Sequence, residues 1–263
     1  MNIIKREVKA SRLNILIWSF AFFFLSYAGI IKFDSIIGDG TTGVVDLLNR
    51  IPRVILALFN MVDLDITYLP DYFSIIASYL MVMVASQGLF LGIGLFAKEE
   101  QRKTADFLLT KPRSRTRIYL QKVASGIVII LLLQLVVFLC NWSALQDYLP
   151  GVMTMLKNYT LALAVVHLLF FGLGVLLVNI LPRGRAETAG LAAILISYFV
   201  PVLANMSERY YQLRDYFPFN MFLQRSMEQP GGTPVVKLMI LFVLALLFII
   251  IGMKKFEKKD IYV

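Results

Sequence analysis

Long apolar segments alternate with shorter polar segments along the whole chain. An α-helix needs roughly 20 consecutive apolar residues to cross the hydrocarbon core of a bilayer. The alternation therefore predicts an all-α, polytopic membrane protein. Its six expected spans are residues 15–31, 72–97, 119–140, 159–181, 186–204 and 235–253.

Residues 1–14, which precede the first span, have a different pattern. At helical spacing their apolar side chains fall toward one side and Lys5, Lys9 and Arg12 group on another. This is typical of an amphipathic helix lying in the membrane interface, although a basic flank that only fixes orientation has the same composition. Ser26-Tyr27-Ala28 in the first span resembles a signal-peptidase site, and we expect an uncleaved anchor.

The composition agrees with a membrane class. Hydrophobic residues make up 59% of the chain and charged residues 16%, whereas soluble domains are about half apolar. The single cysteine, Cys140, excludes an internal disulfide and a cysteine-rich metal cluster. Since no linker or shift in composition interrupts the pattern, we expect one transmembrane domain over residues 1–263.

The net charge of +9 would fit nucleic-acid binding if the basic residues formed one surface stripe. They lie between apolar segments instead, and most of the 26 belong to alternate connections. Because Lys and Arg are retained on the cytoplasmic side of a membrane, both termini are expected to be cytoplasmic. The segments assigned to that side are residues 1–14, 98–122, 182–185 and 254–263.

Two long segments are assigned to the outer side. Residues 32–71 are rich in Asp, and their apolar middle, residues 51–62, is expected to form a helix or to dip into the interface. Residues 205–234 are rich in Tyr and Phe, which prefer the headgroup zone. In the second span, the spacing of Gly88 and Gly92 favours close approach of another helix.

Candidate chemistry is sparse. The chain has no Gly-rich phosphate loop ending in Gly-Lys-Ser/Thr, so any use of ATP requires another subunit. The Glu99-Glu100 pair resembles that of one class of intramembrane protease, but such a site needs histidines and His167 is the only one. No Asp or Glu lies in the interior of a predicted span, which disfavours an ion-coupled secondary transporter without excluding it. An ATP-independent secondary transporter or channel stays the alternative function.

A few polar side chains remain inside the predicted spans. They can either line a transport pathway or form hydrogen bonds between helices. The candidate pathway residues are Gln87, Gln134, His167 and Asn179.

The inner segment 98–118 differs from an ordinary topological signal because it contains a short apolar patch within a basic stretch. Phe107, Leu108 and Leu109 are too few to span a bilayer and too apolar to remain exposed. A patch of this kind fits a contact with a partner protein.

Six spans, the amphipathic first helix and the order of residues in segment 98–122 together resemble the membrane subunits of type-2, exporter-class ABC transporters. The tail with Lys259-Asp260-Ile261 and the outer Phe217-Pro218-Phe219-Asn220 are similar to that family as well. Lys103 and Asp106 depart from the usual Gly and Glu. The residues that carry the resemblance in the inner segment are Glu99, Glu100, Thr104, Asp106, Leu108, Leu109, Pro112, Ser114, Arg115 and Lys122.

The resemblance implies a permease in the plasma membrane of a bacterium, with segment 98–118 as a coupling element that docks on a cytoplasmic ATP-binding subunit. It also implies a second permease, identical or related, and places ATP and Mg²⁺ on the partner subunit, with no catalytic residue in this chain. The expected coupling residues are Glu99, Glu100, Thr104, Asp106, Phe107, Leu108, Leu109, Pro112 and Arg115.

Overall fold

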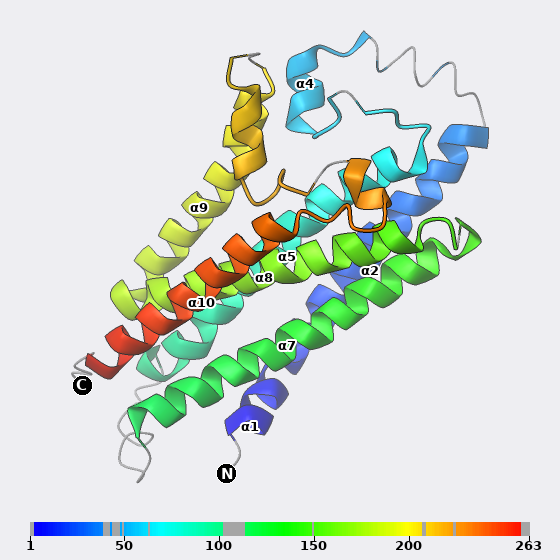
Figure 1. The fold of residues 1–263 in the computed structure, drawn as a ribbon. Helices are drawn as coiled ribbons and strands as arrows, with labels where there is room; N and C mark the ends of the chain where they lie inside the picture. The colour runs from blue at the N-terminus through cyan, green and yellow to red at the C-terminus, as the bar shows by residue number, and fades with distance from the viewer. Residues whose placement is uncertain are drawn as a thin grey trace.

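The computed structural model describes residues 3–38, 43, 48, 50–62, 64–101, 114–148, 150–206, 209–222 and 225–258. Within these residues, six helices are long and apolar enough to cross a membrane, and no strand is present. This confirms the predicted all-α, multi-pass architecture (Figure 1). The six helices are α2 (Arg12–Gly38), α5 (Leu69–Gln101), α7 (Arg115–Ala144), α8 (Met153–Ile180), α9 (Arg183–Ala204) and α10 (Val235–Lys258).

Shorter helices occupy the segments before and between the spans. The predicted first helix is observed as α1 (Ile3–Ala10), directly followed by α2. Within the apolar middle of the first long connection lies α4 (Arg53–Leu58). The aromatic segment after α9 contains two short 3-10 helices, η2 (Tyr211–Tyr216) and η3 (Arg225–Glu228).

Helices α5 and α8 form the centre of the bundle. Their most apolar windows are 72% and 61% buried, whereas those of α2, α9 and α10 are only 17%, 28% and 22% buried. The mean hydropathy of these windows does not follow the same order, since it is 3.0 for the exposed α10 and 2.0 for the buried α5, so the difference reflects position rather than composition. The peripheral helices expose large apolar side chains such as Phe20 and Leu203, as helices facing lipid do.

Glycines bring the two central helices into backbone contact. A Cβ atom added to Gly88 would lie 2.6 Å from the His167 carbonyl oxygen, and one added to Gly92 would lie 2.5 Å from the Phe171 carbonyl oxygen. Neither distance is compatible with a side chain. The predicted close approach at Gly88 and Gly92 is confirmed, and the helix that approaches is α8.

The two ends of the bundle are distinct. At one end, Lys98 near the end of α5 pairs with Glu7 of α1, and Arg115 at the start of α7 donates a hydrogen bond to the Glu257 carbonyl oxygen of α10 at 3.1 Å. We call this the loop end, because segment 98–118 begins and finishes there.

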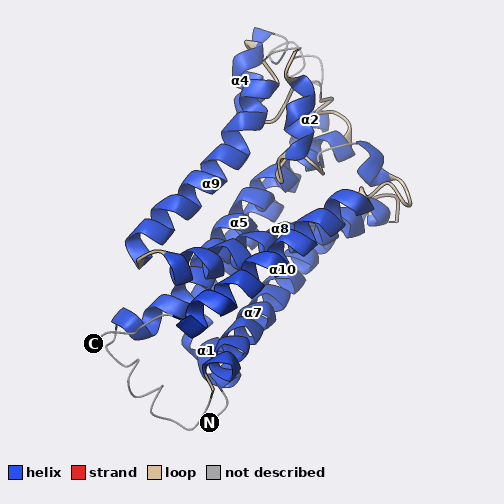
Figure 2. Cartoon of the chain, turned by 60° about the vertical axis from the view of Figure 1, so that its left-hand side comes forward, coloured by secondary structure: helices blue, strands red, loops and turns tan. Residues whose placement is uncertain are grey.

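The opposite end, the far end, carries α4 and the aromatic segment (Figures 1 and 2). Here the Tyr198 hydroxyl group of α9 donates a hydrogen bond to the Leu58 carbonyl oxygen of α4 at 2.6 Å. Ala57, Val62 and Val202 form a small apolar cluster beside this bond, separate from the main core. Helix α9 is therefore joined to α4 at the far end as well as to α5 and α8.

Candidate functional site

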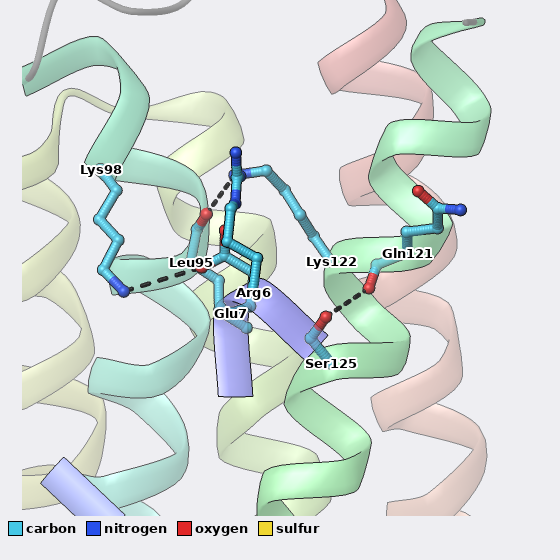
Figure 3. Close-up of polar contacts among 7 residues, drawn as sticks. All are labelled: Arg6, Glu7, Leu95, Lys98, Gln121, Lys122 and Ser125. Atoms are coloured by element: carbon cyan, nitrogen blue, oxygen red, sulfur yellow. Dashed lines mark hydrogen bonds and ion pairs between the residues drawn. The ribbon is translucent and has the colours of Figure 1, made fainter. Parts of the chain in front are cut away.

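The two ends of segment 98–118 lie in a polar cluster built from α1, α5 and α7. Figure 3 shows Lys98 of α5 meeting Glu7 of α1 and the Lys122 side chain of α7 reaching the Leu95 carbonyl oxygen of α5, while Ser125 bonds to the Gln121 carbonyl oxygen along α7. We call this cluster the loop base. Its members are Arg6, Glu7, Leu95, Lys98, Gln121, Lys122 and Ser125.

Lys122 ties the start of α7 to the end of α5. Its side chain is almost fully buried, its ammonium group donates a hydrogen bond to the Leu95 carbonyl oxygen, and its Nζ atom lies 5.3 Å from the centroid of the Phe96 ring. A buried charge is tolerated only when it is bonded, and both the carbonyl oxygen and the ring face attract a cation. The contact therefore holds α5 and α7, the two helices that segment 98–118 connects, against each other.

Glu7 ties α1 to the same place. Although the residue is only 4% exposed, Arg6 Nη2 lies 2.8 Å from its Oε1 and Lys98 Nζ lies 3.7 Å from its Oε2. The carboxylate therefore joins the first helix to the last turns of α5. Sequence reasoning overlooked Glu7, although it is the one acidic residue in a basic segment and falls on the same helical side as Ile3.

Arg115 is the predicted coupling residue whose side-chain contacts are described. It begins α7, where the Ser114 hydroxyl oxygen accepts a hydrogen bond from the Arg117 backbone N–H and caps the helix. Thr116 adds a hydrogen bond of 2.6 Å from its hydroxyl group to a Glu257 carboxylate oxygen, next to the Arg115 contact. The start of α7 is thus fixed to both α5 and α10.

The other predicted coupling residues fall at or beyond the end of α5. Glu99 and Glu100 belong to the last turn of that helix. The remaining six lie outside the described residues: Thr104, Asp106, Phe107, Leu108, Leu109 and Pro112. Their coupling role stays a prediction.

Three of the four candidate pathway residues form one buried network in the middle of the bundle. His167 of α8 is fully buried, with its Nε2 atom 2.5 Å from Gln87 Oε1 and its Nδ1 atom 3.0 Å from Gln134 Nε2. A neutral imidazole has one donor and one acceptor nitrogen. The amide oxygen of Gln87 accepts from the ring N–H, and the amide N–H of Gln134 donates to the other ring nitrogen.

This network joins helices α5, α7 and α8 without placing a charge in the bundle. Such residues are expected either to line a transport pathway or to form hydrogen bonds between helices. These distances are those of hydrogen bonds between helices. The fourth candidate, Asn179, is separate: its side-chain amide donates to the Val175 carbonyl oxygen of its own helix at 2.7 Å. A role of these four residues in lining a pathway stays a prediction.

Comparison with known proteins gives one family match. The family is described as "Multidrug efflux system permease Rv1217c, C-terminal domain", and the match covers residues 8–257. No curated protein matches the chain. The matched region begins at Val8 within α1 and ends at Glu257, one residue before the end of α10, so it covers the six apolar helices and the loop-base residues of α5 and α7. This chain therefore belongs to the family of the multidrug efflux system permease Rv1217c, C-terminal domain.

Proposed function

We propose that this chain is the permease subunit of an ATP-driven, type-2 ABC exporter. In this proposal, segment 98–118 docks on a separate cytoplasmic ATP-binding subunit, and the permease pairs with a second copy or a related chain to form the pathway. The observation that carries the proposal is the loop base. It ties the end of α5 to α1 through Lys98 and Glu7, and to the start of α7 through the Leu95 carbonyl oxygen and Lys122, so both ends of the segment are attached to the bundle.

The contacts of the loop base give a physical route for movement. A displacement of segment 98–118 would reach α5 and α7 through the chain itself, and α10 through the hydrogen bond from Arg115 to Glu257. The Lys122 bond to Leu95 limits separation of these two helices, and Glu7 makes α1 follow Lys98. Because α5 packs on α8 through glycines, a shift of α5 would move the centre of the bundle.

The family description suggests the class of substrate. A multidrug efflux permease handles compounds of varied shape, and apolar or amphiphilic small molecules fit a bundle whose outer helices are exposed and apolar. We therefore propose drug-like amphiphiles as substrates, with ATP and Mg²⁺ held by the partner subunit.

The test is co-expression with a candidate ATP-binding subunit. Phe107→Asp and Leu108→Asp place a charge in the proposed docking patch, and each should abolish copurification and ATP-dependent transport. Tyr216→Asp is the matched control, since it adds the same charge to an exposed aromatic residue at the far end. Unchanged copurification and transport in the two patch variants would refute docking at this segment.

The alternative function is an ATP-independent carrier or channel. It predicts that the purified chain alone moves substrate across liposome membranes without nucleotide. Transport that depends on the ATP-binding subunit and on ATP excludes this alternative.

A further inference from the structure

Helices α1 and α2 present one continuous outer stripe that changes from basic to apolar. Ser11 is the single residue between the two helices: its N–H donates to the Glu7 carbonyl oxygen of α1 at 3.0 Å, and its carbonyl oxygen accepts from the Ile15 N–H of α2 at 2.9 Å. Helical periodicity is therefore nearly maintained from one helix to the next. The α1–α2 stripe consists of Lys5, Lys9, Arg12, Leu16, Phe20 and Phe23, spaced three or four residues apart.

The stripe points away from the bundle. On the opposite side of α1, Ile3, Glu7 and Ser11 are buried, which fixes the rotation of this helix. All six stripe residues are exposed, with relative exposures of 65% for Leu16 and 69% for Phe20.

Lys5, Lys9 and Arg12 form the basic part of the stripe. Within the part of the chain that the structure describes, Lys5, Lys9 and Arg12 form no ion pair, whereas their neighbour Arg6 is paired with Glu7. The three cationic groups lie at successive turns along one helical side, so they are positioned to act on a single anionic group or on adjacent ones.

We infer that the α1–α2 stripe is a binding site for an anionic phospholipid. Lys5, Lys9 and Arg12 contact the phosphate and its anionic headgroup, and an acyl chain lies along Leu16, Phe20 and Phe23. The apolar continuation selects a lipid over a soluble anion, because exposed Leu and Phe side chains add binding only for a ligand with a hydrocarbon chain. This site is independent of any ATP-binding partner.

The position of the stripe gives the lipid a structural role. Glu7, on the buried side of the same helix, pairs with Lys98 at the end of α5. A lipid bound to the outer side would hold α1 against the loop base and so stabilise this end of the bundle. The expected consequence is a higher thermal stability of the whole chain in anionic membranes than in neutral ones.

The experiment uses the full chain with two triple variants that each remove three positive charges. K5Q/K9Q/R12Q alters the stripe, and K254Q/K255Q/K258Q alters exposed lysines at the end of α10, which also lies at the loop end. Each protein is reconstituted in phosphatidylcholine alone or mixed with phosphatidylglycerol. Thermal unfolding and lipid retained in native mass spectrometry are measured.

Phosphatidylglycerol should raise the unfolding temperature of the unaltered chain and of the α10 variant, and both should retain it. The stripe variant should lose the shift and most of the retained lipid. Each basic residue near an anionic surface strengthens binding on the order of fivefold, so the single variant Lys9→Gln should show a partial loss and serves as the test if the triple variant does not fold. Equal losses in both triple variants, or an equal shift with inorganic phosphate instead of lipid, would overturn the proposal.

Discussion

The buried His167 network and the loop base are both polar clusters that join three helices, but they use different chemistry. The network lies in the middle of the bundle, is fully enclosed and consists of neutral groups. The loop base lies at one end and consists largely of charged groups, with Glu7 and Lys122 buried and Lys98 partly exposed.

The difference follows from the distance to water. A charged side chain in the hydrocarbon core is strongly disfavoured, whereas neutral amides and an imidazole can bond to one another there without a counter-charge. The bonding is incomplete, because Gln87 Nε2 and Gln134 Oε1 have no hydrogen-bond partner among the described residues. Near the ends of the spans, long cationic side chains reach the interface, so forming an ion pair there costs less free energy than in the hydrocarbon core. We therefore expect the network to determine stability and the loop base to determine how movement enters the bundle.

The largest loss of stability should come from the contact of Gly92 with α8, one helical turn from the His167 network. Gly92→Val would force a side chain against the Phe171 carbonyl oxygen of α8, and overpacking of a buried contact costs about 3 kcal/mol or more when backbone cannot yield. Thermal unfolding in detergent measures the loss. Gly94→Val is the control, because no packing neighbour among the described residues lies within 4 Å of a Cβ there. Similar losses in both variants would contradict the assigned contact.

The next largest effect should come from the network itself. His167→Leu leaves the bonded amide atoms of Gln87 and Gln134 without their partner, which should lower stability by about 1–2 kcal/mol. The triple variant Q87L/H167L/Q134L removes all three polar groups together and should be less destabilised than the single variant. If chemical denaturation gives the reverse order, the hydrogen bonds are not what stabilises this part of the bundle.

At the loop base, Lys122→Met separates an effect on stability from an effect on transport. Methionine keeps the apolar stem but removes the hydrogen bond to Leu95, so the loss of stability should be only about 1 kcal/mol. ATP-dependent transport with the partner subunit should fall much further than stability does. Lys254→Met is the control for charge at the same end, and unchanged transport in Lys122→Met would exclude a positioning role in coupling.

The smallest effect is expected at Asn179. Among the described residues, the one hydrogen bond of its amide goes to a carbonyl oxygen of its own helix, so Asn179→Leu should change stability by less than about 0.5 kcal/mol. The same unfolding assay applies. A loss as large as that of His167→Leu would mean that Asn179 also joins helices, and a selective loss of transport would support its role in the pathway.

Much of the candidate site could be recognised from the sequence as a set of residue types. Gln87, Gln134 and His167 stood out as polar groups in apolar spans, and Gly88 and Gly92 as a contact surface. The sequence does not tell which of these residues bond to each other. Gln87 and His167 are 80 positions apart, and which helices pack together depends on the three-dimensional structure. Glu7 was overlooked for the same reason, since its importance comes from Lys98 on another helix.

The sequence by itself determined the number and place of the spans, because the thickness of a bilayer and the need to bond every backbone group within a helix leave a long apolar segment only one structure. Only the tertiary structure decided that α5 and α8 lie at the centre while α2, α9 and α10 lie at the periphery. Lipid is as apolar as the protein interior, so hydrophobicity cannot tell a helix that faces lipid from one that faces its neighbours.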